Sequence, residues 1–137
     1  MSQSKSRSYG RILWVGAPVL GMFAGYGAWL LVVNARAYCD AAFEPGQKLG
    51  LVVVELPASV IGYGLCALVV HGAGWIATFR APTLLRVCVP LLLVVTALAL
   101  LADWYFMVEG TPDGYPGDSG LCPPSNIPPW WPGWLPA

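Results

Sequence analysis

Residues 49–108 decide the fold of this chain and read LGLVVVELPASVIGYGLCALVVHGAGWIATFRAPTLLRVCVPLLLVVTALALLADWYFMV. The stretch contains two apolar segments, 49–77 and 87–108, which are joined by a short loop containing Arg80 and Arg86. Each segment is long enough for the roughly 20 apolar residues that a helix needs to cross the hydrocarbon core of a bilayer. The stretch therefore predicts two consecutive membrane-spanning helices.

A third apolar segment, 12–33, precedes this pair and predicts an all-α membrane protein with three transmembrane helices. Composition agrees, because 57% of the 137 residues are hydrophobic and 10% are charged, whereas roughly a quarter of the residues in a soluble domain are charged. Cleavage of the first segment as a signal peptide near Ala37 is the alternative. The expected domains are an N-terminal segment at 1–11, a membrane domain at 12–108 with a loop at 34–48, and a tail at 109–137.

The charged residues divide between the two ends of these helices. Lys5, Arg7 and Arg11 precede the first span, and the two arginines of the short loop lie between the second and third spans. Cytoplasmic segments carry an excess of Lys and Arg, so we expect a cytoplasmic N-terminus and an external C-terminus. All seven acidic residues then fall on the external side, in the loop and tail (Asp40, Glu44, Glu109, Asp113 and Asp118) or near the outer ends of the spans (Glu55 and Asp103).

The four cysteines follow the same division. Cys39 in the loop and Cys122 in the tail are both expected on the external side, where oxidation is permitted. We therefore expect a disulfide between them that closes an irregular external cap, with two unpaired thiols as the alternative. Cys66 and Cys88 lie within spans and are interpreted as small packing residues.

Small residues recur every four positions on two of the predicted helices. Ala17, Gly21 and Gly25 do so in the first span, and Ala58 and Gly62 do so in the second. Small side chains let helix backbones approach closely in a membrane. We therefore expect these two faces to pack the first and second helices together, while the bulky third span faces lipid or a broad partner surface.

Each span contains a proline, Pro18, Pro57 or Pro90, which is expected to bend or locally open its helix. Pro57 follows Glu55 closely, and a broken turn beside a carboxylate can form an ion site. The interpretation that we favour is a helix that begins late, with residues 49–54 partly at the membrane interface.

Glu55 and Asp103 lie at similar depth near the outer ends of their spans. Ionisable residues within a membrane are costly, so they are candidates for function. The two carboxylates are a possible cation or proton site if the folded helices bring them together. The other interpretation is that each reaches the external interface or pairs with Arg36 or Lys48.

No motif for catalysis or for a cofactor is present in the sequence. His71 is the only histidine, and it has no Cys or carboxylate at ligand spacing, so we expect no metal site and interpret it as a hydrogen-bonded or interfacial residue. The absence of catalytic signatures and cofactor motifs makes an enzyme the less expected class. Zero net charge and the lack of a basic run predict no nucleic-acid partner.

The tail ends in CPPSNIPPWWPGWLPA at residues 122–137. Its prolines favour polyproline II and turn geometry over helix. Trp130, Trp131 and Trp134 can sit at the headgroup level of the membrane, dock on the loop at 34–48 as a cap, or be bound by a partner that recognises Pro-rich segments. The expected disulfide favours the cap.

Residues 122–136, CPPSNIPPWWPGWLP, follow a linker rich in glycine and proline and an Ala/Leu/Val/Gly-rich set of spans. This combination resembles the tails of small uncharacterised integral membrane proteins from actinobacteria. The resemblance covers the tail and implies a bacterial plasma membrane.

These features predict a protein that works through contact in the membrane. We expect an accessory or structural subunit whose partners are lipid and a larger membrane complex or further copies of itself. A homo-oligomeric cation or proton channel, or a transporter component, that uses Glu55 and Asp103 is one alternative. A small membrane enzyme that uses Glu55, His71 or a cysteine is another.

The charge division makes a direct prediction about topology. A cysteine introduced at Ser4 should react with a membrane-impermeant thiol reagent only after permeabilisation, whereas one at Ser125 should react in intact cells, because basic residues stay in the cytoplasm. Both variants are made without the native cysteines. Reaction at Ser4 in intact cells would invert the topology.

Overall fold

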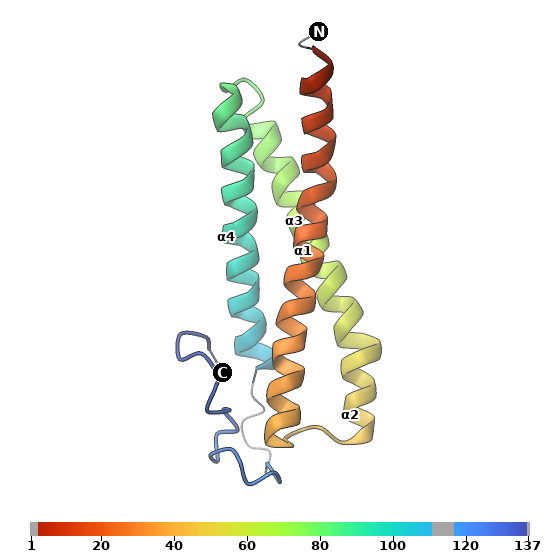
Figure 1. Cartoon of the computed structure of the whole chain (residues 1–137), viewed down its shortest axis with the longest axis vertical. Helices are drawn as coiled ribbons and strands as arrows, with labels where there is room; N and C mark the ends of the chain where they lie inside the picture. The colour runs from red at the N-terminus through yellow and green to blue at the C-terminus, as the bar shows by residue number, and fades with distance from the viewer. Residues whose placement is uncertain (1–2, 111–116, 137) are drawn as a thin grey trace. The chain divides into compact units, whose positions relative to one another are not determined.

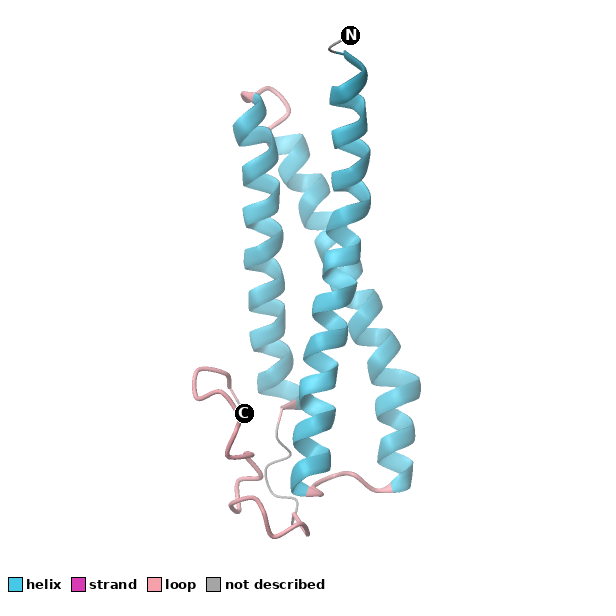
Figure 2. Ribbon diagram, in the orientation of Figure 1, coloured by secondary structure: helices cyan, strands magenta, loops and turns pink. Residues whose placement is uncertain are grey.

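The computed structural model describes residues 3–110 and 117–136, with side chains from Trp14 onward (Figure 1). Residues 111–116 of the expected glycine- and proline-rich linker, which include Asp113, lie outside the described residues, as do the basic side chains of the N-terminal segment. Within the described ranges the chain forms helices joined by loops and contains no strand (Figure 2). The all-α prediction is therefore confirmed.

The helices of the described ranges follow one another in a simple order. They are α1 (Gln3–Cys39), α2 (Pro45–Gly50), the π-helical segment η1 (Leu51–Glu55), α3 (Leu56–Ala77) and α4 (Thr83–Glu109). Among the described residues, three helical runs are long and apolar enough to cross a membrane, namely Trp14–Cys39, Pro45–Ala77 and Thr83–Glu109. The prediction of three helices that are long and apolar enough to span a membrane is confirmed.

The first helix ends later than the sequence pattern predicts, so part of the expected loop at 34–48 is helical. Asn34 does not interrupt α1, and its side-chain nitrogen donates to the Leu30 carbonyl at 2.7 Å. The helix ends where Asp40 adopts a φ of 49° and the Ala41 N–H donates to the Arg36 carbonyl at 3.1 Å. That pair of features is a Schellman C-cap. The loop itself is reduced to residues 40–44.

The second helical run begins earlier than predicted. Pro45 is the first residue of α2, where its missing N–H leaves no helical hydrogen bond unmade. The side chain of Gln47 accepts the N–H of Glu44 at 3.1 Å, which stabilises this start. The interpretation of a helix that begins late is therefore wrong, because residues 49–54 are helical, whereas their place partly at the membrane interface stays a prediction.

The local opening expected near Pro57 takes the form of the π-helical segment η1. Proline has no N–H to give to the preceding turn, and the helix accommodates this by widening. The Leu56 N–H bonds the Leu51 carbonyl, and the indole N–H of Trp29 donates to the same oxygen at 2.8 Å. A side chain of α1 therefore supports the widened turn. The other two prolines remain inside helices, Pro18 in α1 and Pro90 in α4.

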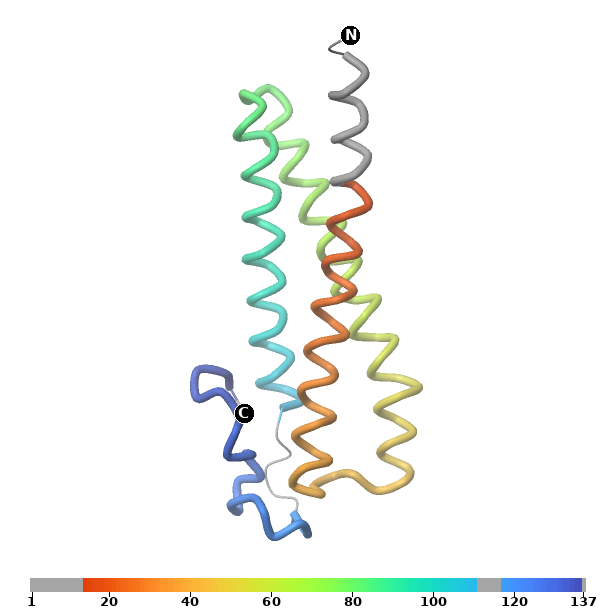
Figure 3. Tube along the Cα trace, viewed as in Figure 1, coloured from red at the N-terminus to blue at the C-terminus, as the bar shows by residue number. Residues whose placement is uncertain are grey.

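The chain divides into two compact units. Unit 1 comprises Met1–Gly25 and Val60–Leu100, and unit 2 comprises Tyr26–Ser59 and Leu101–Ala137. Helices α1, α3 and α4 each contribute one segment to unit 1 and another to unit 2, as the chain trace in Figure 3 allows the reader to follow. Each unit has its own helix contacts.

In unit 1, α1 and α3 approach closely at Gly21. A Cβ atom on Gly21 would lie 2.9 Å from the Cβ of Ala67 and would also collide with the carbonyl oxygen of Tyr63. Ala17 and Gly25 are buried on α1. The predicted small-residue face of the first helix is therefore buried, and at Gly21 it packs against the second membrane helix.

The face that α3 presents to α1 differs from the predicted one. Ala58 and Gly62 are exposed, and a Cβ on Gly62 would meet no described atom of a neighbouring segment within 4 Å. The contact face contains Tyr63, Gly64 and Ala67 instead, all of them buried. The close approach is set by the main chain of Tyr63 opposite a glycine, and the spacing of small side chains does not reveal such a contact.

A second glycine brings α3 close to α4 within unit 1. A Cβ on Gly74 would lie 2.9 Å from the Cα of Pro90. Val94 and Leu98 are buried on the same helix as Pro90. The third membrane helix therefore has a packed side as well as exposed bulky residues.

The two glycine positions give opposite predictions for stability. Gly21→Ala should lower the free energy of unfolding by about 1–3 kcal/mol, because the added methyl group overpacks the contact. Gly62→Ala should leave it unchanged or raise it by up to about 1 kcal/mol through helix propensity. Unfolding in mixed micelles, followed by circular dichroism, measures both. Equal losses would contradict the assigned faces.

Candidate functional site

Arg36, in the last turn of α1, is the centre of a charged cluster in unit 2. Its side chain is 12% exposed. The Nη2 group donates to the main-chain carbonyl of Glu109 at 2.8 Å and to the Oε2 atom of the same residue at 3.1 Å. The Nη1 atom lies 3.9 Å from Oε1 of Glu55. The cluster therefore joins the end of α1 to η1 and to the end of α4.

The two contacts of Arg36 with Glu109 have different physical effects. The last carbonyls of a helix lack intrahelical donors, and a cation there is favoured by the helix dipole. Arg36 supplies both the donor and the positive charge at the C-terminus of α4. The bond to the carboxylate adds a charge-assisted pair in a partly buried position.

The cluster carries one positive and two negative groups. On the side of Glu55 it is incompletely bonded, because Glu55 Oε2 and Arg36 Nε are buried without a hydrogen-bond partner in the described part of the chain. A buried polar atom without a hydrogen-bond partner lowers the free energy of unfolding by about 1–3 kcal/mol. Glu109 therefore contributes the stronger half of the cluster, and Glu55 the weaker half.

The structure places the two predicted carboxylates in different environments. Glu55 pairs with Arg36, which is the alternative that the sequence analysis retained. Asp103 is exposed on α4 and takes no part in the cluster. The second carboxylate near Arg36 is Glu109, six residues further along and about 240° further round the helix. Among the described ion pairs, the partner of Glu55 is therefore Arg36, and the possible cation or proton site of Glu55 and Asp103 stays a prediction.

Sequence reasoning missed Arg36 and Glu109 as a pair because both were assigned to segments outside the helices. Their opposite charges at the C-terminal ends of the first and third spans were the available signal. The pairing could be recognised only once both helices were known to extend to these residues.

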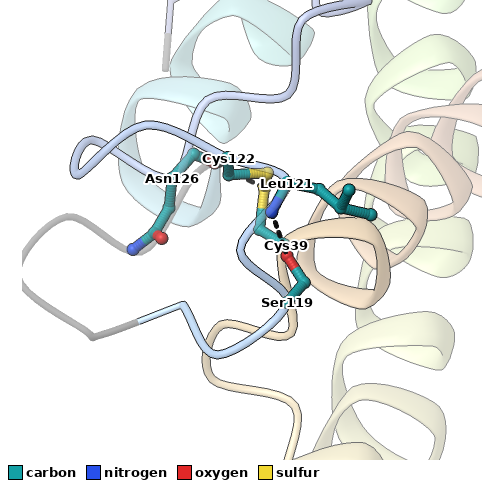
Figure 4. Close-up of a disulfide and its surroundings, with 5 residues drawn as sticks. All are labelled: Cys39, Ser119, Leu121, Cys122 and Asn126. Carbon is teal, nitrogen blue, oxygen red and sulfur yellow. Dashed lines mark hydrogen bonds between the residues drawn. A yellow bond between two sulfur atoms is a disulfide. The ribbon is translucent and has the colours of Figure 1, made fainter.

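A disulfide joins Cys39 to Cys122, which is the pairing expected from the sequence (Figure 4). Their Cα atoms are 5.4 Å apart and they are separated by 83 positions in the chain. Cys39 is the last residue of α1 and follows Arg36 by one helical turn. The bond therefore fixes the tail at the helix end that also carries the charged cluster.

The tail passes close to the end of α1 before it reaches the disulfide. The Ser119 N–H donates to the Cys39 carbonyl at 3.4 Å, and a Cβ on Gly117 would lie 2.8 Å from the same oxygen. The Ser119 hydroxyl accepts the N–H of Leu121 at 3.2 Å, as the dashed line in Figure 4 shows. Asn126 is 2% exposed, and its carbonyl oxygen lies 3.2 Å from the Cys39 sulfur. The segment around the disulfide is thus closely packed.

Proline turns shape the rest of the tail. The N–H groups of Asn126, Trp131 and Leu135 each donate at 2.9 Å to a proline carbonyl three residues earlier. A second proline follows the first in two of these turns, where its fixed φ favours the turn conformation. The sequence predicted polyproline II and turn geometry for this segment, and these three hydrogen bonds are turns.

The three tail tryptophans have different environments. Trp131 is 7% exposed, and its ring meets Phe106 of α4 edge-on at 5.7 Å. Trp130 meets Tyr38 of α1 edge-on at 6.0 Å and is partly exposed. Trp134 is 80% exposed. The tail therefore docks on the last turn of α1 through Trp130 and on the last turn of α4 through Trp131. The sequence analysis expected Trp134 to dock as well, but its side chain is exposed.

Unit 1 contains a second group of interest, around His71. The imidazole is 1% exposed and lies edge-on to Trp14 at 5.6 Å and next to Trp75 at 6.4 Å. Its two nitrogens have no hydrogen-bond partner in the described ranges. Arg86 stacks over the Trp75 ring at 4.2 Å. His71 is thus an aromatic core residue within unit 1.

The remaining candidates for chemistry are dispersed. Cys66 is half-buried and Cys88 is exposed, and both are free thiols. Residues 3–110 and 117–136 contain no group of three or more His, Cys, Asp or Glu side chains that could hold a metal ion.

Comparisons with protein-family models, with curated proteins and with solved structures found no match to this chain.

The unequal halves of the charged cluster predict unequal effects of substitution. Arg36→Gln should lower the free energy of unfolding by roughly 2–4 kcal/mol, between the values for exposed and buried pairs, because it uncaps α4 and leaves two carboxylates together. Glu55→Gln should lower the free energy of unfolding by only about 0–1 kcal/mol, since Arg36 keeps its bonds to Glu109.

Unfolding in mixed micelles measures both losses, with the exposed Asp103→Asn as the matched control that should change nothing. A larger loss for Glu55→Gln than for Arg36→Gln would show that Glu55, and not Glu109, is the main partner of the arginine.

Proposed function

We propose that the protein is an accessory or structural subunit of a larger complex in a bacterial plasma membrane. It acts through helix packing, with its N-terminus in the cytoplasm and its disulfide-closed tail outside. The positions of the basic residues support this orientation. The resemblance of residues 122–136 to the tails of actinobacterial membrane proteins supports the location.

One observation carries the assembly role, namely three exposed glycines inside the membrane helices. Cβ atoms on Gly16 and Gly27 of α1 and on Gly62 of α3 would meet no described atom of a neighbouring segment within 4 Å. Glycine in a helix interior costs about 1 kcal/mol relative to alanine. The contacts described within each unit do not use these positions. A partner helix that approaches closely at a glycine would offset this cost.

Gly62 is the best placed of the three for such a contact. It lies in the second membrane helix, with Ala58 four residues earlier, and both are exposed. Ile61 and Leu65 flank it and are also exposed. The surface therefore combines a recess at the glycine with bulky apolar neighbours, which is the arrangement that packs against a second helix in lipid.

The charged cluster supports assembly over transport. A cation carrier needs a carboxylate that is free to exchange its ligand, whereas Arg36 lies beside Glu55 and is held there by Glu109. The cluster joins segments of three helices, and the disulfide adds the tail to them. These bonds favour a fixed scaffold over a moving ion pathway.

Substitution at Gly62 tests the proposal. Gly62→Leu should leave the isolated chain folded, because the position is open, and should sharply reduce recovery of the complex, because the side chain blocks a partner backbone. Native mass spectrometry after extraction in gentle detergent measures recovery, and it also distinguishes a second copy from a different polypeptide. Leu92→Ile, at an exposed position of α4 outside this surface, is the control.

Two results would contradict the proposal. The first is a monomeric wild-type protein in native extracts, with Gly62→Leu behaving identically. The second is an ion flux in reconstituted vesicles that Glu55→Gln abolishes while Gly62→Leu leaves recovery unchanged, which would favour transport.

A further inference from the structure

We infer that Trp134 anchors the tail in the headgroup layer of the membrane that the helices cross. The inference rests on the membrane-spanning character of the helices and on the packing of unit 2, and it does not depend on the identity of any complex. It divides the three tail tryptophans by role. Trp131 fixes the tail to the protein, Trp130 covers the end of α1, and Trp134 contacts lipid.

The level of Trp134 relative to the membrane follows from the docking of Trp131. Phe106, which Trp131 meets edge-on, lies three residues before the end of α4, or about 4.5 Å inside the helix end. Trp134 follows Trp131 by three residues, which span at most about 10 Å. The turn from Pro132 to Leu135 shortens this reach. The headgroup region on each side of the hydrocarbon core is about 5–8 Å thick, so this layer is within the reach of Trp134.

The disulfide supports the same placement from the other helix. Cys39 is both the last residue of α1 and the last residue of a candidate membrane span. Cys122 is bonded to it, and Trp130 packs on Tyr38 one position earlier in the helix. The tail is therefore held at the ends of two candidate spans. Figure 3 lets the reader trace this tail from its disulfide to Pro136.

The chemistry of the exposed tail surface selects lipid over a protein partner. Within Gly117–Pro136, Asp118 is the only charged residue, so this segment offers little charge for an oppositely charged partner to recognise. The prolines are used in hydrogen-bonded turns, whereas domains that bind Pro-rich ligands require an extended polyproline II segment. An indole ring with an apolar body and one N–H donor matches the mixed polarity of the headgroup layer.

A nitroxide label beside Trp134 tests this inference. Gly133→Cys is a suitable site, because it is exposed and a Cβ there would meet no described atom of a neighbouring segment within 4 Å. The background carries Cys66→Ser and Cys88→Ser, so that the tail disulfide is kept and the label is unique. The purified protein is reconstituted in phosphatidylcholine vesicles, and power saturation measures collisions of the label with oxygen and with a water-soluble nickel chelate.

The label should collide readily with oxygen and rarely with the nickel chelate. Adding Trp134→Ser should raise nickel accessibility several-fold and leave the helical content unchanged. A matched Leu121→Ser, which removes another exposed apolar side chain near the disulfide, should raise it much less. Electrophoresis without reductant checks that the disulfide is intact in each variant.

Two outcomes would overturn the inference. One is a label as accessible to the nickel chelate as a bulk-water site in vesicles that hold only this protein, which would leave Trp134 free for a separate polypeptide. The other is shielding that disappears when the protein is diluted in lipid, which would assign Trp134 to a contact with a second copy.

Discussion

The hydrogen bonds of Arg36 are the interaction on which the arrangement of unit 2 depends. This side chain holds the last carbonyl and the carboxylate of Glu109 and lies beside Glu55, so it connects three helical segments that have no other charged link among the described residues. An arginine suits this role because its planar guanidinium donates in several directions at once. Cys39, which forms the disulfide, lies one turn after Arg36 on the same helix. The tail is thus attached to the helix end that the arginine holds against η1 and α4.

The sequence predicted those features that depend on local composition. Apolar length is a property of one segment, so the three membrane helices could be found, and the cysteine pairing followed from counting spans. Helix ends were less predictable, because Asp40 ends α1 through a left-handed conformation that is usually adopted by glycine. The face of α3 was also missed. Its contact with α1 depends on the rotation of the helix and on the main chain of Tyr63, and the pattern of Ala58 and Gly62 reports neither.

The candidate site shows the same limit more clearly. Glu55 and Asp103 were singled out because they are the acidic residues inside the apolar segments, and this criterion says nothing about the direction in which each side chain points. Glu109 lies on the side of α4 that meets Arg36, while Asp103 is exposed. In the tail, prolines predicted turns correctly as a class. Which tryptophan is buried depends on the tertiary contact of Trp131 with Phe106, and three similar residues in one short segment cannot reveal it.

The disulfide also bears on how the chain is inserted during biosynthesis. Cys39 is synthesised 83 residues before Cys122, and the two thiols meet only if they reach the same side of the membrane. Two of the three spans lie between them, so a chain in which either span failed to cross would leave the cysteines in different compartments. The disulfide can therefore form only after both spans of the hairpin between Cys39 and Cys122 have crossed the membrane.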